Sequence, residues 1–239
     1  MTAFTVSEEE LGTPEDAWAA SPRLASCPPL ACPAPVRVVV VAPHPDDEVL
    51  AVGGWMRALA RAGCAIEVVA VTDGEASHPG PADQLVETRA GERAEALIRL
   101  GVDAAVTRLR CPDGAVSREV DLDRRLEPLV AGASLVLAPW DHDGHPDHDA
   151  TGAAARAACL ATGTPAFSYP VWAWHWARPD SDDLPWSRAR RIPLEPAARE
   201  AKAAAVAAFR SQTEAQRGVT ILPAAVLVRF LRPFEVVFL

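Results

Sequence analysis

Short aliphatic runs alternate with longer helical segments between residue 36 and about residue 160. Residues 38–41 are four consecutive valines, a run typical of a strand buried on both faces of a parallel sheet. Further strands are predicted at 66–71, 105–109 and 135–137, and helices at 47–62, 84–100, 122–130 and 148–160. Alternating strands and helices indicate βαβ units. We therefore expect an α/β fold, with a Rossmann-like, mostly parallel sheet and helices on both faces.

The last third of the chain has a different pattern. Residues 167–176 are rich in aromatic side chains and are predicted to be extended. Trp172, Trp174 and Trp176 alternate, so on a strand they would share one face, with His175 on the other. A helix is predicted at 195–209. Residues 226–230 and 235–238 are expected to be late strands, added antiparallel at the edge of the sheet.

Residues 1–35 precede the first predicted strand and differ from the rest in composition. They begin with an acidic run and continue with several prolines, and no helical or strand period persists through the proline-rich part. We divide the chain into an extension at 1–35 and a domain at 36–239. The extension is expected to lie across the domain or to be partly mobile, and to be dispensable for chemistry.

Composition narrows the classes of partner. The 239 residues carry a formal net charge of −9, which argues against nucleic-acid binding because phosphates require a basic surface. No apolar run is long enough for a transmembrane helix, and the N-terminus lacks the basic start of a signal peptide. Five scattered cysteines do not form a disulfide framework. We expect a soluble cytoplasmic protein without a membrane partner. Assembly into a homo-oligomer is compatible with the sequence.

Two polar clusters follow predicted strands. Residues 43–48 read PHPDDE after the first strand, and residues 141–148 read DHDGHPDH after the fourth. Alone, the first cluster could cap a helix and the second could be a solvated loop. Both, however, follow strands of one α/β pattern, and ligands of open α/β sheets bind beyond the carboxyl ends of strands. The pair is therefore interpreted as a functional site.

The residue types in these clusters suit a metal. One histidine and one aspartate from the first loop, with one histidine from the second, would give three protein ligands and leave a position for water, as in catalytic zinc sites. Asp46 and Asp47 are neighbours whose side chains can take separate tasks, since they point in different directions. His145 and His148 are spaced i, i+3 at a helix start, so they share one face.

At this point the sequence resembles the LmbE/PIG-L family of zinc-dependent de-N-acetylases, over about residues 36–222. The segments APHPDDE (42–48) and HPDH (145–148) match its two signatures. Three further segments resemble motifs of the family, namely TDGE (72–75), RAGE (89–92) with Leu100-Gly101, and CPDG (111–114). The resemblance implies hydrolysis of an acetamide, with removal of an N-acetyl group from an N-acetylglucosamine-type or related small molecule.

The resemblance also implies a role for each matching residue. Zinc, or another divalent metal such as Fe²⁺, would be held by His44, Asp47 and His148. Asp46 would be the general base, His145 the oxyanion stabiliser and acid, and Asp147 would orient a histidine. The predicted contacts to substrate are Arg89, Asp113 and Glu48.

Other functions remain open from the sequence. Two histidines and one carboxylate also satisfy the ligand set of non-haem iron oxygenases, although that set usually occurs on all-β folds. The same fold and metal could hydrolyse a different amide in natural-product metabolism, or bind a ligand without catalysis. The aromatic segment at 172–176 lies where family members differ in substrate, so the substrate itself is not defined.

Overall fold

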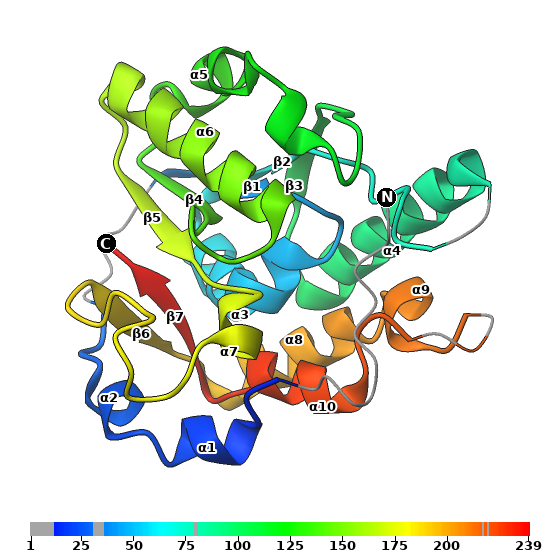
Figure 1. The fold of residues 1–239 in the computed structure, drawn as a ribbon. Helices are drawn as coiled ribbons and strands as arrows, with labels where there is room; N and C mark the ends of the chain where they lie inside the picture. The colour runs from blue at the N-terminus through cyan, green and yellow to red at the C-terminus, as the bar shows by residue number, and fades with distance from the viewer. Residues whose placement is uncertain (1–11, 31–35, 79–80, 217, 219) are drawn as a thin grey trace.

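The computed structural model describes residues 12–30, 36–78, 81–216, 218 and 220–239, and centres on a seven-stranded sheet (Figure 1). The strand order is β3-β2-β1-β4-β5-β7-β6. The strands are β1 (Arg37–Ala42), β2 (Ala65–Ala70), β3 (Ala104–Arg108), β4 (Leu135–Pro139), β5 (Ala166–Tyr169), β6 (Ala189–Pro193) and β7 (Phe234–Phe238). The strands β1 to β5 are mutually parallel, whereas β7 pairs antiparallel with β5 and β6. The predicted α/β class, with late antiparallel strands at one edge, is confirmed.

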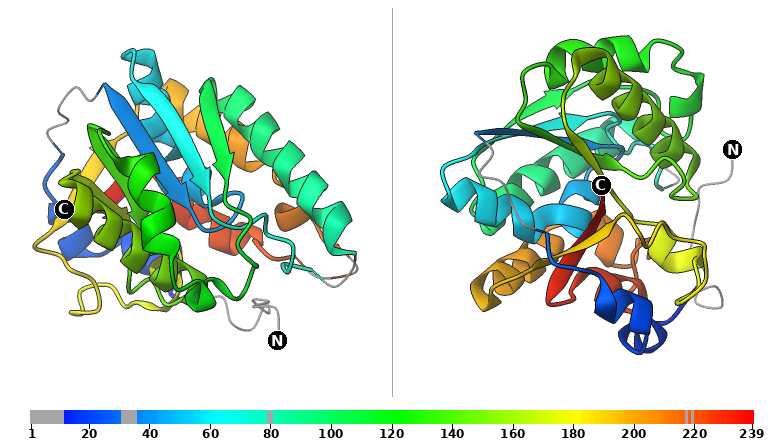
Figure 2. Two further views of the ribbon diagram at one scale, coloured as in Figure 1. Left: turned by 90° about the horizontal axis from the view of Figure 1, so that it is seen from above. Right: turned by 90° about the vertical axis from the view of Figure 1, so that its left-hand side faces the viewer.

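Helices cover both faces of the sheet (Figure 2). One layer consists of α3 (Asp47–Arg61), α4 (Ala82–Leu100) and α8 (Pro196–Val206), and the other of α5 (Leu122–Val130) and α6 (Pro146–Thr162). The valines of β1 divide between the two layers: Val38 and Val40 belong to the larger apolar core, and Val39 and Val41 to the smaller one. This division explains why the run is uninterrupted, because both faces of the strand are buried.

Strands β1 and β4 lie side by side at the point where the connections diverge. After β1 the chain enters α3 on one face, and after β4 it enters α6 on the other. Such a topological switch point opens a crevice at the carboxyl ends of the strands. The two polar clusters of the sequence are the loops at this crevice.

Two segments that were expected to be extended are helical, the first in part and the second throughout. After β5, residues 173–176 form a helical turn, α7 (Ala173–Trp176). Its tryptophans do not share a face, since Trp174 is buried and Trp176 is 43% exposed. Residues 226–230 are not a strand but lie in α10 (Ala224–Leu227) and the 3₁₀ turn η3 (Val228–Phe230). Strand β6 was not predicted. The remaining short helices are α1 (Glu15–Ala19), α2 (Pro22–Ser26), η2 (Val116–Arg118) and α9 (Arg210–Thr213).

Residues 12–30 lie across the domain, one of the two arrangements left open by the sequence. Trp18 is fully buried, and its Nε1 donates to the carbonyl of Trp174 at 3.0 Å. Farther on, the backbone runs beside β6: Leu30 N donates to Arg191 O at 2.7 Å, and Arg191 N donates to Pro28 O at 2.9 Å. The predicted boundary at 35/36 falls against residues 31–35, which lie outside the described part of the chain.

Two expectations from composition concern thiols and membranes. Four cysteines in the described part are buried and no disulfide joins any two of them, namely Cys27, Cys64, Cys111 and Cys159; Cys32 lies outside that part. Within the same residues, no helix combines the length and apolar character needed to cross a bilayer.

Candidate metal and catalytic site

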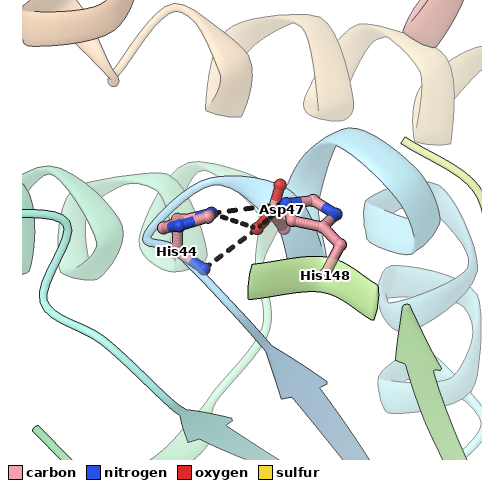
Figure 3. A group of neighbouring side chains, drawn as sticks. All are labelled: His44, Asp47 and His148. Atoms are coloured by element: carbon pink, nitrogen blue, oxygen red, sulfur yellow. Dashed lines mark hydrogen bonds and ion pairs between the residues drawn. The ribbon is translucent and has the colours of Figure 1, made fainter. Parts of the chain in front are cut away.

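Three predicted metal ligands converge at the switch point (Figure 3). His44 comes from the loop after β1, Asp47 is the first residue of α3, and His148 lies in the first turn of α6. Oδ2 of Asp47 lies 3.2 Å from Nδ1 of His44 and 3.2 Å from Nε2 of His148. The two nitrogens are 3.3 Å apart. One carboxylate oxygen and two imidazole nitrogens therefore form a compact triangle.

The triangle fits a metal ion in size. Ligands about 2.0–2.2 Å from a tetrahedral zinc ion are roughly 3.3–3.6 Å apart, so these atoms need to move little to accept one. The three side chains are mostly or fully buried, so little water can compete with them for a bound ion. His44 also belongs to a second group of neighbouring ligand types, with His145 and Asp147.

The charge around the triangle also favours a cation. Burial lowers the pKa of His148, but the carboxylates of Asp47 and Asp143 outweigh it and raise that pKa to about 9. Burial raises the pKa of Asp47, but His148 and His44 reverse this and hold it well below its usual range. Asp47 is thus ionised, and further aspartates surround the histidines. A bound cation would compensate this concentration of negative charge.

Each histidine of the triangle has a carboxylate at its other ring nitrogen. Nε2 of His44 lies 3.2 Å from Oδ1 of Asp113 and 3.3 Å from Oδ2 of Asp147. Nδ1 of His148 lies 2.8 Å from Oδ2 of Asp143. Such carboxylates fix the tautomer and the ring orientation of metal-binding histidines. Asp147 thus lies where it can orient His44. Asp143 has the corresponding place beside His148, and no sequence motif had pointed to it.

Asp46 lies beside the triangle and has different partners from Asp47. Its backbone has φ 141° and ψ −31°, a conformation that non-glycine residues rarely adopt. Arg89 lies 3.1 Å from its Oδ2 and also donates to the carbonyl of Pro45 at 2.8 Å. Burial raises the pKa of Asp46 to about 7, against the lowering effect of Arg89. The two neighbouring carboxylates are therefore separated by backbone geometry into two environments.

His145 is the residue before α6 and faces the same crevice. Its Nδ1 accepts a hydrogen bond from the backbone N–H of Asp147 at 3.2 Å, so the neutral ring carries its proton on Nε2. Burial, together with His148 and His44, lowers the pKa of His145 to about 3. The ring stacks on that of Trp172 at a centroid distance of 5.9 Å. His145 is thus a neutral hydrogen-bond donor.

A cavity of about 490 Å³ opens onto these side chains. Arg89 and Asp113, predicted to contact substrate, line it, although Arg89 also holds the loop of Asp46. Glu48 does not line it, which corrects the third predicted contact. It is fully buried, accepts from Nε of Arg93 at 2.9 Å, and accepts from the backbone N–H of Asp46 at 3.3 Å. Glu48 supports the loop instead.

The cavity is also lined by residues to which the sequence patterns assigned no role in the site. Arg229 comes from η3 and lies 3.1 Å from Nδ1 of His175, and both line the wall. Gln212 of α9 lines it as well. Because these residues come from the last third of the chain, outside the two motif clusters, only the folded arrangement brings them to the site.

Comparisons with known proteins relate this chain to one family. Residues 39–159 match the family described as PIG-L, GlcNAc-PI de-N-acetylase. The conserved protein TT1542 from Thermus thermophilus is 30% identical, with a TM-score of 0.56 over 73% of this chain and 79% of that one. No curated protein matched the chain.

Two further solved structures show the same fold. One is N,N'-diacetylchitobiose deacetylase from Pyrococcus horikoshii, with 23% identity and a TM-score of 0.61 over 83% of this chain and 76% of that one. The other is the A40926 pseudoaglycone deacetylase Dbv21, with 22% identity and a TM-score of 0.65 over 85% and 96%, respectively.

Proposed function

Because this chain belongs to the PIG-L family of GlcNAc-PI de-N-acetylases, we propose that it is a zinc-dependent hydrolase acting on an N-acetylglucosamine-type or related small molecule. It would release acetate and leave a free amine. One observation carries the proposal: His44 and Asp47 line a cavity together with Asp46 and His145, and the third member of the triangle, His148, is buried directly behind them. A ligand set, a base and a hydrogen-bond donor thus meet in one place.

Each residue then has a task that its contacts allow. A zinc ion, when bound, would supply Lewis acidity and make water a better nucleophile. Asp46 accepts a proton from the attacking water, and a pKa raised toward neutrality suits a general base. The Nε2–H of His145 donates to the carbonyl oxygen as negative charge develops there. The water proton held at Asp46 then passes to the leaving amine.

Burial, together with His148 and His44, lowers the pKa of His145 to about 3, which favours a neutral ring. We therefore assign His145 as a neutral donor to the oxyanion rather than as the acid expected from the sequence. Asp147 supports this state, because its backbone N–H occupies Nδ1 of His145. Asp46, protonated by the attacking water, then acts as the acid that donates a proton to the leaving amine.

The experiment is acetate release measured by NMR. The substrates are N-acetylglucosamine, its glycosides and N,N'-diacetylchitobiose, each tested with metal-free protein and after addition of Zn²⁺ or Fe²⁺. We expect release only with metal, and reversal by a chelator. Acetate release by protein shown to be metal-free would contradict the metal dependence. A metal-loaded protein that releases nothing from any acetamide would favour a different amide substrate or a non-catalytic role.

A further inference from the structure

Part of the cavity wall is apolar and starts next to the metal-binding triangle. Leu50 follows Asp47 by one turn of α3, and its backbone N–H donates to the carbonyl of Asp46 at 2.8 Å. From Leu50 the apolar lining extends to α10 and η3. The side chains in this apolar wall are between 2% and 8% exposed and are Leu50, Val171, Ile221, Leu222, Val226 and Phe230.

The apolar wall is a fixed part of the domain. All of its members belong to the larger apolar core. The backbone N–H of Leu222 donates to the carbonyl of Gln212 at 2.8 Å, which ties the segment before α10 to α9. The wall cannot turn its apolar side chains elsewhere without opening the core.

Polar side chains beside this wall are held by other protein groups. Nε2 of Gln212 donates to Oγ of Ser211 at 2.8 Å. Arg229 lies 3.1 Å from Nδ1 of His175. A hydroxyl-rich ligand placed against Leu222 and Val226 would lose hydrogen bonds to water and meet carbon atoms, which is unfavourable. An alkyl or aryl group in the same place would be stabilised by burial of its surface.

We propose that the substrate is an N-acetylated sugar joined through its glycosidic oxygen to an alkyl or aryl group, and that this group lies against the apolar wall. The proposal rests on the proposed deacetylation. The sugar then occupies the polar end of the cavity, beside Asp113 and Arg89, and the apolar group reaches α10. Leu222 and Val226 become specificity-determining residues.

The test compares two glycosides with the same sugar. Phenyl and methyl N-acetylglucosaminides differ only in the group that would meet the wall. We expect kcat/KM for the phenyl compound to exceed that for the methyl compound by about tenfold or more, as filled apolar pockets give. Leu222→Asn and the milder Val226→Thr should each reduce this ratio by several-fold. Val228→Thr is the matched control, because Val228 is 42% exposed and does not line the cavity. Thermal unfolding verifies that each variant is folded.

Binding separates this inference from the proposed reaction. Calorimetry with metal-loaded protein should show the phenyl glycoside binding about tenfold more tightly than the methyl glycoside, whether or not acetate is released. Equal kcat/KM and equal affinity for the two compounds would overturn the inference and leave deacetylation intact. Preference for N-acetylglucosamine 1-phosphate over the phenyl glycoside would also overturn it, since an anion would then be the recognised group. Tighter phenyl binding without any acetate release would support the wall and contradict the reaction.

Discussion

Oδ2 of Asp143 lies 2.8 Å from Nδ1 of His148, and the same carboxylate accepts hydrogen bonds from the cavity wall. The backbone N–H groups of Val171, Trp172 and Ala173 donate to it, each at 2.9 Å. Asp143 is fully buried. One carboxylate therefore fixes a candidate metal ligand and the start of α7 together.

We expect Asp143→Asn to weaken zinc binding by about 10–100-fold, the usual effect of removing such a partner. The amide keeps the size of the side chain, but its NH₂ group cannot accept a hydrogen bond. The contact with His148 or with a backbone N–H is therefore lost. Zinc affinity is measured by competition with a chelator. Asp141→Asn is the matched control in the same loop, since Asp141 pairs with Arg156 at the surface. Equal affinities for the two variants would contradict the positioning role.

The adjacent carboxylates should respond differently to substitution. Asp46→Asn should keep the metal and lose about 10²–10⁴-fold in rate, because it removes a proton acceptor. Asparagine also tolerates the positive φ at this position better than alanine would. Asp47→Ala should lose both metal and activity, because affinity depends on the full ligand set. Metal content by plasma mass spectrometry is compared with turnover. An empty site in Asp46→Asn and a full one in Asp47→Ala would reverse the assignment.

Trp18 packs residues 12–30 against the larger apolar core. Its ring meets that of Trp174 edge to face at 4.9 Å, and Arg232 lies over it while pairing with Glu15. Trp18→Ala should lower the free energy of unfolding by about 3–5 kcal/mol. Trp18→Phe should lower it less, since it keeps most of the apolar surface and loses the bond to Trp174. Urea unfolding measures both; a loss below about 1 kcal/mol in Trp18→Ala would show that the segment is peripheral.

Glu235 and Lys202 form a buried pair that supports α3. Nζ of Lys202 lies 2.7 Å from Oε1 of Glu235, whose carboxylate also accepts the N–H groups of Gly54 and Trp55 just after the non-helical residue Val52. Lys202→Met should destabilise by about 3–5 kcal/mol, because it leaves a buried charge without its partner. Adding Glu235→Gln should recover part of this loss. If the double variant is as unstable as the sum of the two single ones, the ion pair is not coupled.

The sequence predicted the central parallel strands β1, β2 and β4 because these strands are mostly buried and their residues form short aliphatic runs. The valine run of β1 was located within one residue at each end, and the two loops that follow β1 and β4 carried the candidate ligands. Residue spacing failed where distant contacts decide the conformation. The alternation of Trp172, Trp174 and Trp176 has the period of a strand. In the structure, however, Asp143 accepts hydrogen bonds from three successive N–H groups at this place, and the chain continues into the helical turn α7. Glu48 was predicted to contact substrate because it follows Asp47 in the motif, but its position on α3 directs its side chain into the protein interior.

The path of residues 28–30 has a consequence for the behaviour of the protein at high concentration. An exposed outer strand invites pairing with another molecule, and β6 would be such a strand. Residues 28–30 occupy its free side, and two of them, Pro28 and Pro29, have no N–H to offer to a further strand. Another strand would therefore find few backbone donors beside β6. We expect residues 28–30 to protect the molecule from edge-to-edge aggregation as well as to stabilise its core.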